Sequence, residues 1–397
     1  MIQRRPDATS PRANRLGRAQ PRLLGVVCLA LCATIARTDE PATQPVQSSA
    51  PQDSPADAKL SQDAAPGAAR RRAGAHALQQ GLDYLAALQR ESIDGSFPLT
   101  GSAKNLQAPV AISALGTLAL LSGGSTPGRG PHGPEVARGI DYLLARVQLQ
   151  SAAPEQGYVG SGADLTSRLH GHGFATLALA QAFAISPKSP RGARLARALA
   201  LATALIERTQ GAEGGWYYEP RVEVQHEGSV TICLVQALRA ARNAGVTIDG
   251  AVIARAESYV RRSQAENGAF RYQIGSDQTS VALTAAAIST LNAAGRYQDT
   301  SIERGLEAIW RDLAERERNG EVAAHPYYER FYLAQALWQN PDRSLFDRWY
   351  EEELRDVLAS QQEDGSWQGS GYGIAYSTAM QCLFLSIPLE TLPILSR

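Results

Sequence analysis

Two kinds of apolar pattern alternate along the chain from about Ala73 to the C-terminus. Between Pro134 and Gln150 apolar side chains recur every three or four residues, as in a helix with one apolar stripe. In other segments nearly every position is apolar, which is typical of a helix buried on all sides. These segments are Val110–Leu121, Phe174–Phe183, Val230–Leu238, Val281–Leu291, Phe331–Trp338 and Ala375–Leu385. The pattern predicts striped outer helices that alternate with buried inner helices.

A short phrase recurs between each outer helix and the following inner helix. It consists of a glutamine at the helix end, a turn with glycine, and then an aromatic residue. The glutamines are Gln89, Gln148, Gln210, Gln264 and Gln361, and the aromatics are Phe97, Tyr158, Trp216, Phe270 and Trp367. Glycine adopts positive φ without strain, and glutamine can satisfy free backbone carbonyls at its own helix end. The last gap spans about two repeats, so one copy near residues 310–325 has lost the phrase.

The repeats predict an all-α domain over residues 73–397 with twelve helices in six pairs. Six pairs that close on themselves form an α/α toroid, with an inner and an outer ring of helices. An open superhelix is the alternative arrangement of such repeats.

The N-terminal region differs in composition from the repeats. Residues 1–36 combine a basic stretch with the apolar run Leu23–Ala36, which is typical of a signal peptide or, if uncleaved, a signal anchor. Residues 37–72 are rich in Pro, Ala, Gln and Ser and predict a disordered linker. We therefore expect an exported protein of the periplasm or cell envelope, which contacts a membrane only through an uncleaved N-terminal segment.

Charge and cysteine content narrow the function classes. The 39 basic and 39 acidic residues give a formal net charge of zero, which argues against a nucleic-acid-binding protein. Cys233 and Cys382 lie inside apolar runs, where a thiol acts as a small hydrophobic residue. The sequence indicates no disulfide framework.

The Gln–Gly–Trp phrases in a six-pair ring resemble the prenyltransferase and squalene-oxidase repeat family, which includes terpenoid cyclases, protein prenyltransferase β subunits and thioester domains. Asp364–Trp367 is the clearest match, and Leu169–Ala180 and Gly214–Pro220 look like segments of uncharacterised secreted bacterial members. The resemblance implies an αα-toroid and an isoprenoid or other apolar ligand in the ring cavity. Because prenyltransferase β subunits act with an α partner, it also implies a protein partner.

The catalytic motifs of these relatives are missing. The chain has neither the Asp-x-Asp-Asp cluster of squalene–hopene-type cyclases nor the Asp-Asp-x-x-Asp motif that binds magnesium and diphosphate. The zinc-binding Asp-x-Cys of protein prenyltransferases is absent, since Thr231 and Met380 precede the two cysteines, and so is the thioester motif. We accordingly predict no cofactor.

Candidate site residues lie where the inner helices begin. In a toroid these N-termini share one mouth of the ring, where their dipoles and free amides favour ligands. The candidates for ligand binding are His170, His172, Trp216, Tyr218, Tyr327, Tyr328, Tyr372 and Tyr376. Their aromatic rings could face an isoprenoid chain and stabilise carbocations, stack on sugars, or simply pack.

Two sharper hypotheses concern the polar residues at the same positions. His170, His172, His226 and His325 could hold a divalent metal, although the alternative is that they cap helices and order loops. Glu227 with Asp277 or Asp164 could act as acid and base on a sugar, although acidic residues at helix starts are usually caps.

Three functions follow from these patterns. The first is a terpenoid-cyclase-like protein that binds an isoprenoid in an open cavity lined by tyrosines. The second is a non-enzymatic scaffold or binding module of the cell envelope, for which the cavity should be plugged. The third is a carbohydrate-active αα-barrel with paired carboxylates.

Overall fold

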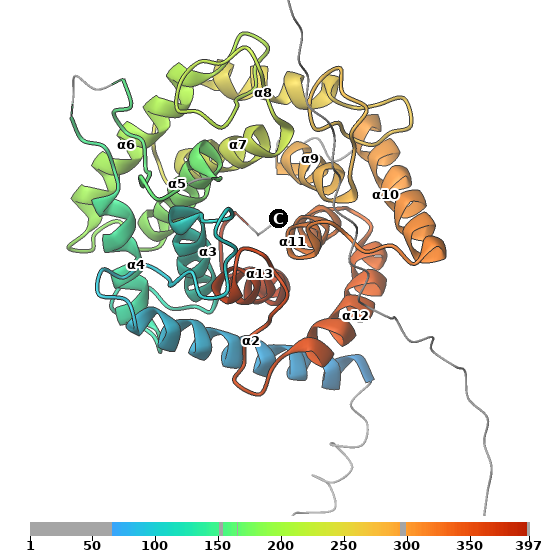
Figure 1. Ribbon diagram of the computed structural model, residues 1–397, viewed down its shortest axis with the longest axis horizontal. Helices are drawn as coiled ribbons and strands as arrows, with labels where there is room; N and C mark the ends of the chain where they lie inside the picture. Colours follow the sequence, from blue (N-terminus) through green and yellow to red (C-terminus); the bar gives the residue numbers. More distant parts are fainter. Residues whose placement is uncertain (1–65, 151–153, 165, 294–298, 395–397) are drawn as a thin grey trace, which may run out of the picture. The chain divides into compact units, whose positions relative to one another are not determined.

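Twelve α-helices form two concentric rings in the computed structural model, which describes residues 66–150, 154–164, 166–293 and 299–394. Figure 1 shows the inner ring of six helices surrounded by the outer six. The outer helices are α2 (Pro66–Arg90), α4 (Gly133–Ala145), α6 (Gly192–Thr209), α8 (Gly250–Arg262), α10 (Thr300–Asn319) and α12 (Arg343–Ser360). The inner helices are α3 (Pro109–Ser122), α5 (Arg168–Ile185), α7 (Gly228–Asn243), α9 (Val281–Ala293), α11 (Pro326–Trp338) and α13 (Ile374–Ser386). The predicted all-α toroid is confirmed.

Burial separates the two rings as the apolar patterns predict. Nearly every residue of α3 and α9 is buried, whereas α8 buries one face only, through residues such as Val252, Ile253 and Val260. Cys233 and Cys382 are free thiols in this core. Within the described residues no helix is long and apolar enough to cross a membrane.

The N-terminal boundary of the ring precedes the predicted one. The export segment and the linker up to residue 65 lie outside the described residues. Helix α2 begins at Pro66, inside the stretch assigned to the linker. Arg70 forms an ion pair with Glu351 of α12 at 2.8 Å, so this first part of α2 already contacts the ring.

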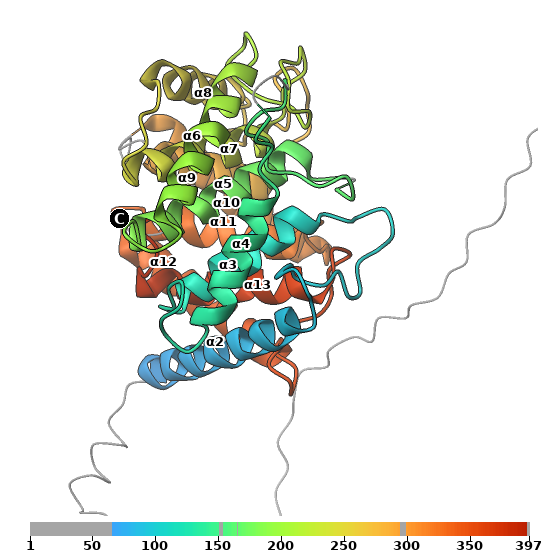
Figure 2. The ribbon, with the colours of Figure 1, turned by 90° about the vertical axis from the view of Figure 1, so that its left-hand side faces the viewer.

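The ring is closed, and the open superhelix is therefore wrong. Helix α13 packs against both α2 and α3, and α12 packs against α2, so the last repeat contacts the first. At the C-terminal ends of the inner helices the segment after α13 covers the ring. The Thr391 hydroxyl donates to the Ser122 carbonyl at 2.6 Å, and Leu392 is 1% exposed. In Figure 2 this end lies at the left, and the connections into α3 and α5 lie at the right.

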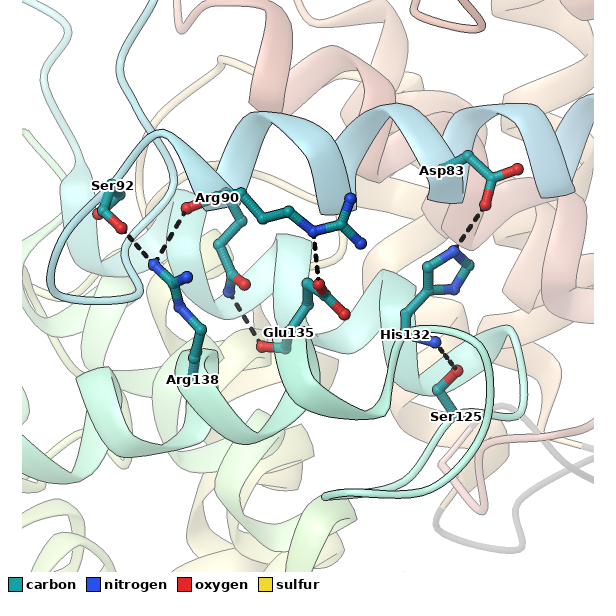
Figure 3. A network of polar contacts seen from close by, with 8 residues as sticks. Asp83, Arg90, Ser92, Ser125, His132, Glu135 and Arg138 are labelled. Atoms are coloured by element: carbon teal, nitrogen blue, oxygen red, sulfur yellow. Dashed lines mark hydrogen bonds and ion pairs between the residues drawn. The ribbon is translucent and has the colours of Figure 1, made fainter.

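The phrase glutamine joins neighbouring outer helices. Gln89 donates through Nε2 to the carbonyl of Gly95 in its own turn and to that of Glu135 in α4, both at 3.1 Å. Gln210, Gln264 and Gln361 do the same with Val252, Ser301 and Ala77 of the next outer helix. Our expectation that the glutamine serves its own helix end was therefore incomplete. Figure 3 shows this joint between α2 and α4, where Arg138 also donates to the Ser92 carbonyl.

The turn glycine of each phrase lies directly against the next outer helix. A Cβ at these glycines would come within 2.0–2.6 Å of a carbonyl oxygen of that helix. The glycine–carbonyl pairs are Gly95–Arg138, Gly157–Leu201, Gly214–Arg255, Gly268–Arg304 and Gly365–Gln80. All five glycines also have φ between 83° and 93°. Only glycine meets both requirements, and the last pair closes the ring.

Ion pairs hold the repeat that lacks the phrase. Helix α10 ends at Asn319 and is followed by Gly320, whose φ is 66°; no aromatic residue follows this turn directly. Arg316 of α10 instead donates two hydrogen bonds to the Glu329 carboxylate of α11, at 2.6 and 3.0 Å. Arg330 then pairs with Glu353 of α12 at 2.6 Å. Such bidentate, partly buried pairs fix geometry more firmly than exposed ones.

We expect Gln361→Ala to destabilise the ring by about 1–3 kcal/mol, because two buried carbonyls lose their donor. Gln362→Ala is the matched control, since its exposed side chain contacts only the Ser360 carbonyl. Urea unfolding followed by circular dichroism measures both. Equal stabilities for the two variants would show that the glutamine does not hold the joint.

Candidate functional site

Side chains from opposite inner helices meet across the ring axis at the mouth where the inner helices begin. His170 lies in the first turn of α5 and Tyr328 in the first turn of α11, and these two helices lie opposite each other in the ring (Figure 1). Their ring centroids are 6.2 Å apart in an edge-on contact. Phe174 stacks on His170, and Tyr332 packs on Tyr328. The mouth is therefore bridged by a cluster of aromatic rings.

The axis below this contact is filled by polar side chains. The Tyr332 hydroxyl of α11 donates to Gln236 of α7 at 3.2 Å, and Gln236 donates to Gln335 at 3.5 Å. Ser289 of α9 donates to Gln335 at 3.4 Å. Gln236 and Gln335 are buried, and Tyr332 is fully so. We expected an open cavity lined by tyrosines on the ring axis. Among the described residues, the side chains of Gln236, Gln335 and Tyr332 fill the axis below the mouth.

The bridging pair carries polar atoms without partners among the described residues. His170 Nε2 and the Tyr328 hydroxyl are both buried and form no hydrogen bond there. Burial lowers the pKa of His170 to about 4 and raises that of Tyr328 well above its usual value. Both groups are thus neutral near pH 7 and available as hydrogen-bond partners. A buried polar group without a partner costs about 1–3 kcal/mol, which a bound ligand or water would offset.

Glu227 caps α7 at the same mouth. Its Oε1 accepts from the Ser229 amide at 2.9 Å, and its Oε2 accepts from the Val230 amide and the Ser229 hydroxyl, both at 2.7 Å. Burial raises the pKa of its carboxyl group, and hydrogen bonds from Ser229, Val230 and Tyr272 oppose that shift. Glu227 thus serves α7 as an N-cap.

The other two carboxylates proposed as acid or base are those of Asp164 and Asp277. The first accepts hydrogen bonds from a neighbouring residue, and the second is exposed. Asp164 is buried and accepts from the Ser167 amide at 2.8 Å and its hydroxyl at 2.6 Å. It lines a cavity of about 490 Å³ at the outer edge of the mouth, together with Arg146, Tyr158 and Arg168. Asp277 is exposed in the connection before α9. The described geometry therefore does not favour the paired-carboxylate hypothesis.

The four candidate metal-binding histidines lie at separate places in the structure. His172 is fully buried, and its Nδ1 accepts from the Val159 amide at 3.0 Å. His226 packs edge-on against Tyr259, whereas His325 is exposed beside α11. In the part of the chain that the structure describes, no three His, Cys, Asp or Glu side chains gather as a metal site.

The candidate aromatics divide into packing residues and mouth residues. Trp216 is 1% exposed, and its Nε1 donates to the Ile206 carbonyl at 2.8 Å, so it seals its turn. The Tyr218 hydroxyl lies 2.9 Å from that of Tyr272. The sequence interpretation missed Gln236, because no local pattern separates an axis-facing side chain from any other inner-helix residue. It also missed Tyr272, which lies in the connection before α9.

Three of the tyrosines line a small pocket on the α11–α13 side of the mouth. Tyr327, Tyr372 and Tyr376 surround a cavity of about 170 Å³, together with Leu106 and His325. Tyr372 and Tyr376 lie 5.3 Å apart, and Tyr327 and Tyr376 6.3 Å apart, between ring centroids. We call this cavity the tyrosine pocket.

Comparison with known proteins places the fold. No protein-family model matches the chain, and no curated protein is detectably similar in sequence. The type II terpene cyclase MstE from Scytonema, solved with geranylgeranyl dihydroxybenzoate as substrate, is 17% identical, with a TM-score of 0.52 over 82% of this chain and 99% of the cyclase. An unsaturated glucuronyl hydrolase specific for heparin is 10% identical, with a TM-score of 0.53 over 82% of this chain and all of the hydrolase.

An α-amylase from Clostridium perfringens is similar to the same degree, with 10% identity and a TM-score of 0.53 over 79% of this chain and 97% of the amylase. The class is therefore that of the αα-toroids. The chain shares this fold with the cyclase, the hydrolase and the amylase alike, and at these identities the likeness concerns the fold alone.

Proposed function

We propose that this protein is an exported, terpenoid-cyclase-like toroid that binds one isoprenoid-type molecule at the mouth of its inner helices without cyclising it. The observation that carries the proposal is the contact between His170 and Tyr328. Two buried polar atoms meet there without a hydrogen-bond partner of good geometry among the described residues, and only the Tyr332 side chain lies beside the Tyr328 hydroxyl. A ligand with one hydroxyl or carboxyl group on an apolar chain would satisfy them. The aromatic faces of Phe174 and Tyr332 would contact the apolar part.

Further observations support the proposal, and two of them, the filled axis and the cap formed by Glu227, favour binding over cyclisation. A cyclase must enclose its whole substrate, but the axis below the mouth is filled by Gln236, Gln335 and Tyr332. The fold likeness to MstE, which was solved with an isoprenoid substrate, favours an isoprenoid over other apolar molecules. Glu227, one of the carboxylates considered as a catalytic acid or base, caps α7 instead. The N-terminal segment supports export to the periplasm or cell envelope.

The test is titration of the purified protein with geranylgeraniol, followed by native mass spectrometry. We expect one molecule bound per chain and a Kd about tenfold higher for Tyr328→Phe or His170→Phe, because each removes one hydrogen bond and keeps the ring. Tyr84→Phe on the outer helix α2 is the control and should bind like the wild type. Absence of a complex, or equal affinity in all variants, contradicts the proposal.

A further inference from the structure

The tyrosine pocket is separate from the His170–Tyr328 contact and has a different chemistry. Three connections that lie far apart in the sequence build it. They are residues 99–108 before α3, 368–373 before α13, and the start of α11. Its volume of about 170 Å³ is close to that of a cavity that holds a benzene-sized molecule, ~150 Å³. The pocket thus suits one compact group and not an extended chain.

Backbone hydrogen bonds hold the walls of the pocket in place. The Ser102 hydroxyl donates to the Tyr372 carbonyl at 2.5 Å, and the Ala103 amide donates to the Gly371 carbonyl at 2.8 Å. The Tyr327 hydroxyl donates to the Gln368 carbonyl. Because these contacts fix the walls, binding in the pocket needs little reorganisation.

The rings of Tyr327, Tyr372 and Tyr376 are inclined to one another around the pocket. The planes of Tyr327 and Tyr376 meet at 81°, and those of Tyr372 and Tyr376 at 48°. A tyrosine face carries negative potential, so several faces around one small space attract a cation. Methylated ammonium groups are bound in this way, because they are cationic and poorly served by hydrogen bonds.

The charges around the pocket agree with a cationic ligand. The connections that lead into the inner helices carry thirteen acidic and four basic residues. Arginines of the helices offset part of this acidic excess, as Arg168 does with Glu219 and Arg262 with Glu213. Burial, and then the Asp164 carboxylate, raise the pKa of the Tyr372 hydroxyl. The positive charge of Arg330, which lowers the pKa of Tyr327, is paired with the Glu353 carboxylate at 2.6 Å.

We infer that the tyrosine pocket binds a small quaternary ammonium group, of the kind that choline carries. The ammonium methyl groups would contact the faces of Tyr327, Tyr372 and Tyr376, and the acidic residues of the connections would raise the local concentration of the cation. The inference is independent of the isoprenoid proposal, since it uses other residues and another ligand.

Isothermal titration of the wild-type protein at low salt tests this, with choline against 3,3-dimethyl-1-butanol, its neutral analogue of the same shape. We expect choline to bind at least tenfold more tightly and to weaken as salt is added. Equal affinities for choline and its neutral analogue would show that the pocket binds by apolar contact alone, and they would overturn the inference. The same holds if choline does not bind at millimolar concentration.

Variants of Tyr372 distinguish the ring from its hydroxyl group. Tyr372→Phe keeps the aromatic face and should bind choline like the wild type, whereas Tyr372→Leu should bind at least tenfold more weakly. Tyr217→Leu, at the same mouth but outside the pocket, should leave choline binding unchanged. Loss of binding in Tyr372→Phe would assign recognition to the hydroxyl group and contradict a cation–π site.

Discussion

Replacing Gly365 with alanine is expected to lower the free energy of unfolding by about 3 kcal/mol. Gly365 has a φ of 88°, a conformation that costs an alanine about 1–2 kcal/mol. Its new Cβ would also lie 2.6 Å from the Gln80 carbonyl oxygen, which belongs to the rigid backbone of α2. Overpacking of this kind typically costs a further 1–3 kcal/mol.

Gly245→Ala separates the two contributions. Gly245 has a φ of 93°, but nothing lies within 4 Å of the place where its Cβ would stand. This control should therefore lose only the backbone part, about 1–2 kcal/mol. Urea unfolding by circular dichroism gives both values. If the two variants lose the same stability, the contact between Gly365 and α2 does not contribute to ring closure.

Acidification is expected to destabilise the protein steeply below pH 6.5. Burial lowers the pKa of His170 to about 4 and is the main cause that lowers the pKa of His172 to about 3. Burial also lowers the pKa of His226. Between pH 6.5 and 4 the unfolded chain therefore binds protons at these three histidines more readily than the folded protein does. Stability is present in full above pH 6.5 and falls with pH by at most about 1.4 kcal/mol per pH unit for each histidine.

His170→Phe tests this dependence, because His170 Nε2 has no hydrogen-bond partner in the described structure. Denaturation midpoints at pH 7, 6 and 5 should fall less steeply in this variant than in the wild type, because only His172 and His226 then contribute to the slope. Glu227 acts in the opposite sense, since its raised pKa makes stability fall as pH rises above about 4.5, and it is present in both proteins. The exposed His76 provides the control, and His76→Asn should keep the full slope.

Much of the fold could be predicted from the sequence because it depends on local patterns of apolar and polar residues. A helix that is apolar on all sides, such as α3 or α9, can be buried only in the inner layer of a two-layer ring. Helix ends were harder, since α4 ends at Ala145 and not near Gln150. Val147 there leaves the helix to pair with Val159.

The candidate site was predicted only in its location. The starts of the inner helices do share one mouth, and His170 and Tyr328 meet there. Their contact joins residues of two opposite helices, so neither local spacing nor helical periodicity could reveal it. The capping roles of Glu227 and Asp164 likewise depend on which backbone amides their carboxylates reach. The sequence shows only that a carboxylate stands near a helix start.

Closure of the ring has a consequence for how the chain matures. The last phrase, with Gln361 and Gly365, docks on Ala77 and Gln80 of the first helix. A chain that emerges from the ribosome or from an export channel in N-to-C order leaves that face of α2 uncovered until its final segment follows. The ring can therefore close only after residues 361–365 have been made, and a chain truncated before residue 361 is left with an open, aggregation-prone edge.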